Sequence, residues 1–98
     1  MIRQNDNKLY IKLGRELTED NLDVFYNELK TFDFDKKKYE NVVIELNDVL
    51  EVDFFGYQTL YFFCDYLVNS LNYPKEKVVF YGKTKNIIEF EEKMGISL

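Results

Sequence analysis

The chain has 98 residues, of which 46% are hydrophobic, and it carries a formal net charge of −5 at neutral pH. This length is typical of one domain and allows a core that needs no metal or disulfide for its stability. The acidic balance argues against nucleic-acid binding, which requires clustered Lys and Arg side chains. We therefore expect a single globular domain, residues 1–98, without affinity for nucleic acid.

The sequence contains no histidine and a single cysteine, Cys64. It therefore lacks the commonest general base and metal ligand, and one cysteine cannot form an internal disulfide. Cys64 falls on the apolar stripe of a predicted helix, so we interpret it as a packed thiol and not as a nucleophile. No glycine-rich phosphate-binding motif occurs either, and we expect neither a cofactor nor a metal.

The N-terminal residues 1–7 are polar, so we expect no signal peptide at this end of the chain. No apolar run approaches the ~20 residues that a transmembrane helix requires. We predict a cytoplasmic protein that does not insert directly into a membrane.

Alternating apolar residues predict a first strand at residues 8–13, which Gly14 ends. Residues 2–4 could pair with this strand across the turn-prone segment Asn-Asp-Asn. Thr18 then caps a predicted helix that runs to about Lys30. The apolar positions of this helix follow the i, i+3, i+4, i+7 spacing of an amphipathic helix: Leu22, Phe25, Tyr26 and Leu29.

The β-branched run NVVIEL, residues 41–46, predicts a buried strand. The following helix is predicted to begin at Gly56 or its neighbour and to end near Asn72. Its inward stripe is predicted to consist of Tyr57, Leu60, Tyr61, Cys64, Leu67, Val68 and Leu71. Further rings make the helix apolar on its remaining surface too, so either a neighbouring helix covers them or they form an exposed patch for a partner: Phe62, Phe63 and Tyr66.

A last strand is predicted at residues 77–81, and Thr84 and Gly95 are suited to cap the helix that follows it. The apolar positions of that helix are Ile87, Ile88, Phe90 and Met94. The predicted order of elements is β(β)αβαβα. Alternating strands and helices predict an α/β fold with parallel neighbouring strands.

Four carboxylates lie close together in the sequence: Glu45, Asp48, Glu51 and Asp53. Paired carboxylates can perform acid–base chemistry. In a chain with 18 acidic residues such a cluster arises easily, and no other residue offers a recognisable electrophile stabiliser. We therefore predict that the protein is not an enzyme.

The stretch VVIELNDVLEVDFFGYQTL resembles the central motif of STAS domains, the anti-sigma factor antagonist family. In that motif an apolar strand ends in Asp-Leu-Ser-Gly-Val, and an apolar residue, Asp-Ser-Ser-Gly and an apolar helix follow. Residues 45–49 correspond to the first part and residues 52–56 to the second. The segments LGREL, residues 13–17, and VVFYGKTKNIIEFEEKMGI, residues 78–96, are also similar to the family, so the resemblance covers most of the chain.

The resemblance implies a mixed sheet of four to five strands with helices packed on it. It also implies binding to other signalling proteins, which phosphorylation of the serine before the glycine switches off. Here Phe55 stands at the phosphoacceptor position and Phe54 at the neighbouring serine position, so the switch is absent at its usual place. Thr59 is the nearest hydroxyl, and we interpret it as a packed or locally bonded side chain.

We therefore predict a non-enzymatic protein–protein interaction domain in bacterial signalling or transcription regulation. The expected partner is an anti-sigma factor, a kinase or a signalling scaffold. The residues predicted to contact it are Asp53, Phe54, Phe55, Gly56 and Tyr57. Two alternatives are a small-ligand sensor, whose rings line an apolar pocket, and a structural subunit that forms a homodimer or stabilises a transporter or signalling complex.

Overall fold

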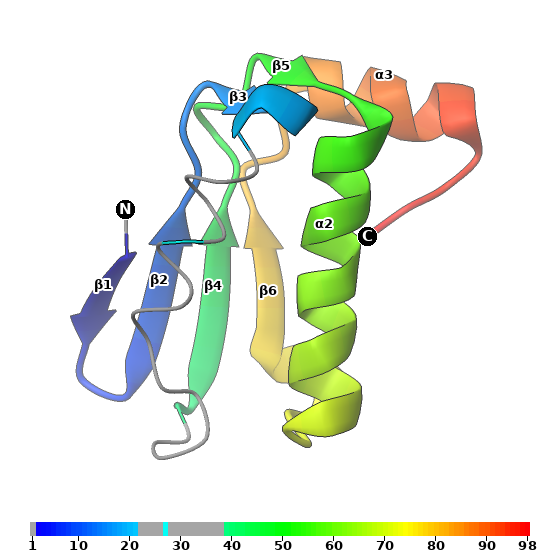
Figure 1. Cartoon of the computed structure of the whole chain (residues 1–98). Coiled ribbons are helices and arrows are strands. Elements are labelled where there is room, and N and C mark those ends of the chain that lie inside the picture. The colour runs from blue at the N-terminus through cyan, green and yellow to red at the C-terminus, as the bar shows by residue number, and fades with distance from the viewer. Residues whose placement is uncertain (1, 22–26, 28–38) are drawn as a thin grey trace.

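The computed structural model describes residues 2–21, 27 and 39–98, and it contains a mixed sheet of four strands (Figure 1). The sheet has the spatial order β1-β2-β4-β6, made of β1 (Ile2–Asn5), β2 (Lys8–Lys12), β4 (Asn41–Glu45) and β6 (Val78–Tyr81). The β1 strand is antiparallel to β2, whereas β4 is parallel to both β2 and β6. The predicted α/β class, the N-terminal hairpin and the parallel neighbours are thus confirmed.

One face of this sheet is buried and the other is open, as the alternation in the sequence predicts. In the parallel pair β2–β4, Leu9 lies opposite Val42 and Ile11 opposite Ile44, and all four side chains are fully buried. The residues between them, such as Tyr10, point to the other face and are only half-buried. The side-chain period of two therefore sets which face meets the helices.

A second, smaller sheet was not predicted. It consists of β3 (Glu16–Leu17) paired in parallel with β5 (Glu51–Val52), and the 3₁₀ turn η1 (Glu19–Asn21) follows β3. Strands of two residues are too short to produce a readable alternation, which explains why the sequence did not indicate them. The remainder of the helix predicted to reach Lys30 lies largely outside the described residues.

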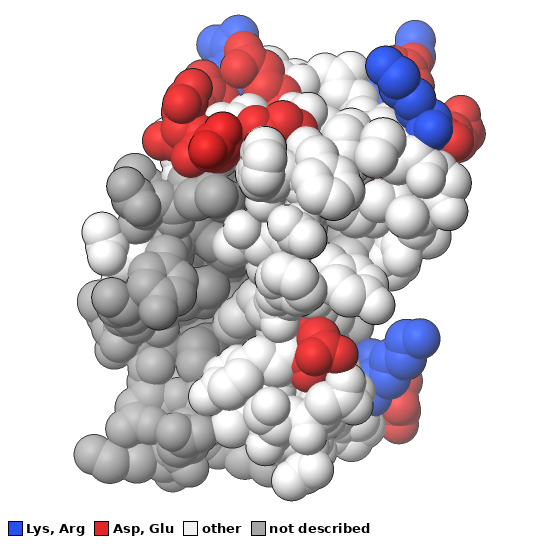
Figure 2. Space-filling model, turned by 45° about the vertical axis from the view of Figure 1, so that its right-hand side comes forward, with Lys and Arg blue, Asp and Glu red and all other residues white. Residues whose placement is uncertain are grey.

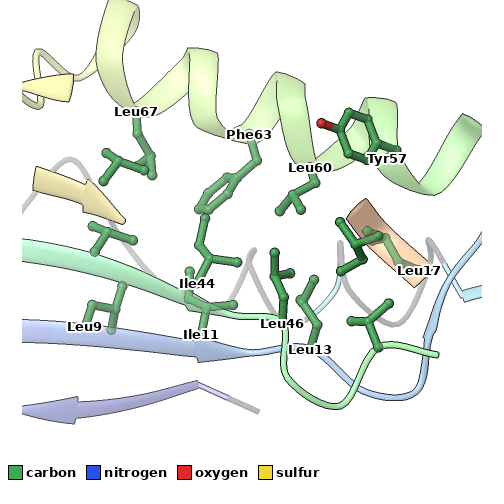
Figure 3. Close-up of a cluster of buried hydrophobic side chains, with 14 of the residues drawn as sticks. Leu9, Ile11, Leu13, Leu17, Ile44, Leu46, Tyr57, Leu60, Phe63 and Leu67 are labelled. Atoms are coloured by element: carbon green, nitrogen blue, oxygen red, sulfur yellow. The ribbon is translucent and has the colours of Figure 1, made fainter. Parts of the chain in front are cut away.

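The long helix α2 (Phe54–Asp65) packs along one face of the main sheet, and a π-helical segment, η2 (Tyr66–Ser70), extends it (Figures 1 and 3). It starts two residues earlier than predicted. Figure 3 shows its buried side chains pointing toward those of β2 and β4, and together they form the core. The buried residues of α2 and η2 are Gly56, Tyr57, Leu60, Phe63 and Leu67.

Two positions of α2 exchange the roles that the sequence suggested. Phe63 was placed among the outer rings, but it is buried in the core. Tyr61 was placed on the inward stripe, but its side chain is about half exposed. The helix has few polar residues, and Asp65, which lies one turn after Tyr61 on the same side, is the only charged one, so the apolar periodicity did not separate these two positions.

The last helix, α3 (Lys85–Met94), follows the 3₁₀ turn η3 (Lys75–Lys77) and β6, and lies across the end of the sheet near β5 (Figure 1). The predicted caps are confirmed: the Thr84 hydroxyl accepts the Ile87 N–H, and Gly95 has a φ of 68°. Of the four apolar positions that the sequence indicated in this helix, Ile88 and Met94 are exposed.

Candidate functional site

The start of α2 is held by Asp53, the first of the predicted contact residues. One carboxylate oxygen accepts the Gly56 N–H at 2.8 Å, and the other accepts the Glu19 N–H of η1 at 3.0 Å. Such a cap satisfies an N–H group that has no partner within the helix, so the helix begins at Phe54. An aspartate directly before an apolar helical run is a typical N-cap, so Asp53 is the signal in the sequence that could have placed the start of the helix at Phe54.

Gly56 is buried where the first turn of α2 presses against β3. A Cβ atom at this position would lie 2.0 Å from the carbonyl oxygen of Leu17, a distance that no real side chain tolerates. Only glycine therefore lets the helix approach the small sheet this closely. Gly56 positions the site, and it does not itself present a surface to a partner.

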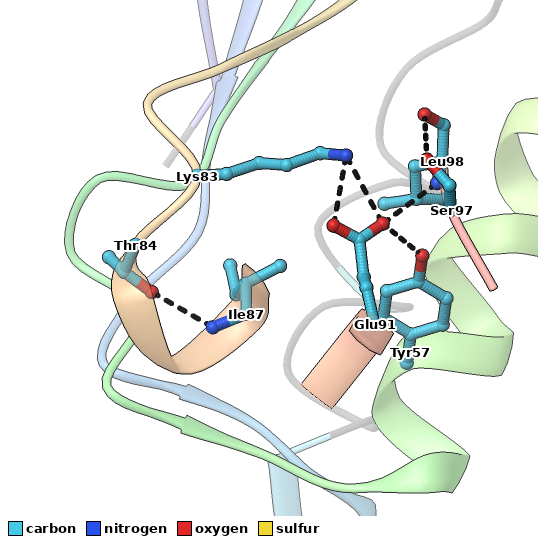
Figure 4. Close-up of polar contacts among 7 residues, drawn as sticks. All are labelled: Tyr57, Lys83, Thr84, Ile87, Glu91, Ser97 and Leu98. Carbon is cyan, nitrogen blue, oxygen red and sulfur yellow. Dashed lines mark hydrogen bonds and ion pairs between the residues drawn. The ribbon is translucent and has the colours of Figure 1, made fainter. Parts of the chain in front are cut away.

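Tyr57 is also buried, with 3% of its surface exposed, and it connects α2 to α3 (Figure 4). Its hydroxyl donates a hydrogen bond of 2.6 Å to Glu91, and its ring packs against Phe90 with 5.3 Å between centroids. Burial and the bond to the carboxylate together raise the pKa of the Tyr57 hydroxyl well above its ordinary value. Like Gly56, this residue fixes the helix from inside.

Glu91 is a buried carboxylate that sequence analysis did not single out. Besides the Tyr57 hydroxyl, it accepts hydrogen bonds from the Lys83 ammonium at 3.0 and 3.1 Å and from the Leu98 N–H at 2.8 Å (Figure 4). Burial by itself raises the pKa of Glu91, but the bonds from Tyr57, Leu98 and Lys83 outweigh it and leave the pKa below its ordinary value. One signal in the sequence could have indicated this buried carboxylate: Glu91 lies one helical turn after Ile87, on the apolar stripe of α3.

Phe54 and Phe55 are the predicted contact residues that do reach the surface. They are 46% and 52% exposed, and their rings meet edge to face with centroids 5.9 Å apart. The hydroxyl of Thr59 donates to the Phe55 carbonyl at 3.0 Å, which confirms that Thr59 is locally bonded. The two rings therefore stand at a helix end that is fixed by several contacts. The nearest hydroxyl, that of Thr59, is bonded to the helix backbone.

The aromatic surface continues along the outer face of α2. Tyr61, Phe62 and Tyr66 are each about half exposed, so of the two interpretations that the sequence left open, the structure shows an exposed patch. An open groove of about 420 Å³ runs between this face and the chain end, lined on the helix side by Phe54 and Phe62 and on the other by Ile96. We call the exposed rings of Phe54, Phe55, Tyr61 and Phe62, together with that of Tyr66 at the start of η2, the aromatic face of α2.

Acidic side chains surround one end of this aromatic face. Glu16 and Glu51 lie on the paired strands β3 and β5, Glu19 and Asp20 lie in η1, and the backbone of Glu19 is bonded to Asp53. Figure 2 shows acidic side chains gathered at one end of the molecule, with a basic side chain beside them, next to an uncharged surface. The start of α2 thus combines exposed rings with neighbouring acidic residues, beside which Arg15 is the basic one.

The other candidates from the sequence have structural contacts. Glu45 pairs with Arg3 at 2.6 Å and Asp48 pairs with Lys12 at 3.3 Å, so these carboxylates are engaged on the open face and at its margin. Cys64 is half-buried, and burial raises the pKa of its thiol, which keeps it protonated at neutral pH. These contacts agree with the interpretation of Cys64 as a packed thiol.

Within the part of the chain that the structure describes, no helix is both long enough and apolar enough to cross a lipid bilayer. The chain was also compared with known proteins. It matches no protein-family model and no curated protein sequence.

Proposed function

We propose that this protein is a non-enzymatic protein-interaction domain of the STAS type, resembling anti-sigma factor antagonists, in bacterial signalling or transcription regulation. Its contact surface is centred on Phe54 and Phe55. The observation that carries the proposal is that both rings are about half exposed at the position where the resembling motif has its two serines. Asp53, Gly56 and Tyr57 belong to the same site because they fix the helix end that presents the rings.

The rigidity of this helix end supports a role in binding. Asp53 joins it to η1, Gly56 allows it to press against Leu17, and Tyr57 ties it to Glu91 of α3. A surface held in one conformation loses little entropy when a partner binds, and aromatic rings are enriched in the cores of protein interfaces. Two large rings in this position therefore have the features of preorganised anchors.

The charge around the rings indicates the chemistry of the partner. Glu16, Glu19, Asp20 and Glu51 surround the start of α2, in a chain whose net charge is −5. A complementary surface has an apolar pocket for the rings and Arg or Lys side chains around it. An anti-sigma factor, a kinase or a signalling scaffold with such a surface is the expected partner.

The same residues bear on regulation, because they offer no site for phosphorylation at the usual position of the motif. A phenyl ring cannot accept a phosphoryl group, and the Thr59 hydroxyl is bonded to the helix backbone. The proposed contact is therefore independent of phosphorylation at this position, in contrast to the switch that the resemblance would imply.

The test compares proteins recovered with the wild-type chain and with Phe55→Glu after crosslinking in the native host. We expect Phe55→Glu to lose at least one specific partner, because a carboxylate would have to enter its apolar pocket beside acidic residues. The recovered partner is then produced in pure form, and its dissociation constant is measured with both chains and at two salt concentrations. A loss of tenfold or more in affinity is expected.

The matched control is Ile88→Glu, which places the same charge on a similarly exposed apolar residue of α3. This variant should retain every partner, and urea unfolding should show that both variants are folded. Equal recovery of all partners with Phe55→Glu and wild type would contradict the proposed surface.

A further inference from the structure

The chain that follows α3 returns to the flank of α2 (Figure 1). Residues 96–98 belong to neither a helix nor a strand, and Ile96 and Ser97 are exposed. The Ile96 N–H is donated to the Glu91 carbonyl at the end of α3, at 3.0 Å. At the other end of the segment, Leu98 is partly buried against the core. Residues 96–98 thus cross from one helix to the other, and we call them the strap.

One side chain holds the far end of the strap. The Leu98 N–H donates to the Glu91 carboxylate at 2.8 Å, to the same oxygen that accepts the Tyr57 hydroxyl (Figure 4). The Ser97 hydroxyl bonds within the strap, to the Leu98 carbonyl. If the strap leaves, Glu91 keeps its bonds to Tyr57 and Lys83, which stabilise its charge. The strap can therefore open without breaking the link between α2 and α3.

The contacts of the strap are few for the number of residues that they order. One hydrogen bond to a carboxylate and one partly buried leucine oppose the conformational entropy of residues 96–98. The neighbouring strands and helices are held by regular backbone bonds and by the core. Segments with few buried contacts open locally at a small cost in free energy. We therefore expect the strap to open more readily than the elements around it.

The strap divides two grooves on the flank of α2. The groove of about 420 Å³ beside the aromatic face is lined by Ile96 and Ser97. A second groove of about 690 Å³, on the β6 side, is lined by Ser97 and Leu98, and Tyr61 lines both. The second groove combines apolar walls with charged residues: Val68, Val78 and Phe80 with Asp65, Lys75 and Lys83. Departure of the strap would join the two grooves into one trough that reaches Phe54.

We propose that the strap occupies the binding site of a peptide segment of the partner, which displaces it and crosses the trough in its place. The strap itself indicates the chemistry of this segment, which is two apolar side chains separated by a small polar residue, as in Ile-Ser-Leu. A backbone N–H of the incoming segment replaces that of Leu98 at Glu91. This inference rests on the proposed function, because the segment belongs to the partner that contacts Phe54 and Phe55.

The strap then acts as an intramolecular competitor of the partner. Because it is tethered to α3 by a short piece of chain, its effective concentration at the trough is high. The partner binds only to the fraction of molecules in which the strap is open, so closure lowers the apparent affinity of the site. Variants that open the strap should therefore bind the segment more tightly than the wild-type chain.

The first measurement tests whether Glu91 holds the strap. Leu98→Pro removes the N–H that Glu91 accepts but keeps an apolar side chain. Ser97→Ala is the matched control, because it keeps both the Leu98 N–H and the Leu98 side chain. Nitrogen-15 relaxation should show residues 96 and 97 ordered in the wild type and in Ser97→Ala, and mobile in Leu98→Pro. Equal order in all three chains would overturn the role of Glu91 as the latch.

The second measurement uses a synthetic peptide, Lys-Met-Gly-Ile-Ser-Leu with blocked ends, which has the sequence of the strap and the residues before it. It is titrated into the labelled chain while the NMR signals of Tyr61 and Lys83 are followed. Leu98→Pro should bind it about fivefold or more tightly than the wild type, because its own strap no longer competes. A peptide with glycine in place of isoleucine and leucine should bind neither chain. Equal affinities for the first peptide, or no binding of it by Leu98→Pro, would overturn the proposal.

The strap and the aromatic face are distinguished by their variants. Phe55 is absent from the lining of both grooves, so Phe55→Glu should leave the peptide titration unchanged. A partner recovered with the wild type should bind Leu98→Pro more tightly, and an unchanged affinity would overturn the competition even if Phe55→Glu weakens that partner. If Phe55→Glu retains every partner, the proposed function fails, and the peptide titration still decides whether the strap covers a binding site.

Discussion

The helices α2 and α3 both contribute to the core, but their outer faces differ in charge. From Phe54 to Cys64 the α2 helix carries no charged residue, and its outer face consists mainly of half-exposed rings. In α3 the outer face carries Lys85 and Glu89, which form an exposed i, i+4 ion pair at 3.7 Å. Its inner face, in turn, contains the buried charge of Glu91.

The two outer faces differ in how well folding alone explains them. A helix that covers a core normally exposes charge on its far side, as α3 does. Burial of the inner face of α2 explains its contribution to the core, but it does not explain five aromatic side chains left half in water. The half-exposed rings of α2 are therefore the surface on which the proposed partner contact is placed, whereas α3 closes the end of the fold.

The largest change in stability is expected from a substitution at the start of α2. Gly56→Ala places a Cβ atom 2.0 Å from the Leu17 carbonyl oxygen, so α2 has to move away from β3. We expect a loss of about 3 kcal/mol or more in the free energy of unfolding, measured with urea. Gly14→Ala is the control, because its Cβ would have no heavy atom within 4 Å, and it should change stability by less than about 0.5 kcal/mol. Equal effects would show that the close approach does not matter.

The second prediction concerns the charge inside α3. Glu91→Gln should lower the free energy of unfolding by about 2–3 kcal/mol at pH 7, because the Lys83 ammonium and the Tyr57 hydroxyl lose a carboxylate acceptor. Glu89→Gln changes an exposed carboxylate of the same helix and should cost less than about 0.5 kcal/mol. A similar loss in the two variants would remove the contrast between the inner and outer charges of α3.

The pH dependence follows from the same residue. The pKa of Glu91 lies below its ordinary value of about 4.3, so its carboxylate stabilises the fold above that pH. This contribution is lost as the pH falls through the folded-state pKa. Urea unfolding at pH 7 and at pH 3 should therefore show a smaller acid-induced loss in Glu91→Gln than in the wild-type chain. An unchanged loss would mean that Glu91 does not titrate with folding.

The third prediction compares the caps of the two helices. Asp53→Ala should cost about 1–2 kcal/mol, because its carboxylate bonds both the Gly56 N–H and the Glu19 N–H. Thr84→Ala should cost about 1 kcal/mol, since its hydroxyl accepts one longer bond of 3.4 Å from Ile87 and donates one to the Val49 carbonyl. Thermal unfolding of both variants measures the two losses. A larger loss of stability in Thr84→Ala than in Asp53→Ala would contradict a special role for Asp53.

The smallest effect on stability is expected on the outer faces. Phe62→Lys on α2 and Ile88→Lys on α3 both replace exposed apolar side chains, so each should change the free energy of unfolding by less than about 0.5 kcal/mol. The two variants should differ in the binding of a hydrophobic dye, which Phe62→Lys lowers clearly and Ile88→Lys hardly affects. A large destabilisation by Phe62→Lys would mean that this ring serves the fold.

The strands and caps could be predicted where the pattern is strong and local. The alternation of Leu9 and Ile11 located β2, and Thr84 and Gly95 marked the two ends of α3. The α2 helix was found but its faces were not, because Tyr61 and Phe63 are both aromatic and Asp65, at the end of the helix, is the only charged residue that marks the outside. The strands β3 and β5 were missed because two residues carry no period.

The residues of the candidate site were chosen from their sequence pattern, which did not predict which of them are exposed and which are buried. All five residues from Asp53 to Tyr57 were expected to contact a partner, and the structure exposes the rings of Phe54 and Phe55 while it buries Gly56 and Tyr57. The buried carboxylate of Glu91 escaped notice because its partner Tyr57 lies 34 positions away in the chain. Such a pairing depends on how two helices pack, which no local pattern encodes.

The sequence by itself determined the α/β class, the parallel strands and the place where α2 starts to within two residues, because these depend on side-chain periods and on groups a few residues apart. The tertiary structure decided which rings remain in water and which carboxylate is buried. These properties depend on what lies across the core or beside an edge, and a neighbour in space is often distant in the sequence. Which rings make up the aromatic face of α2 became clear only once the chain was folded.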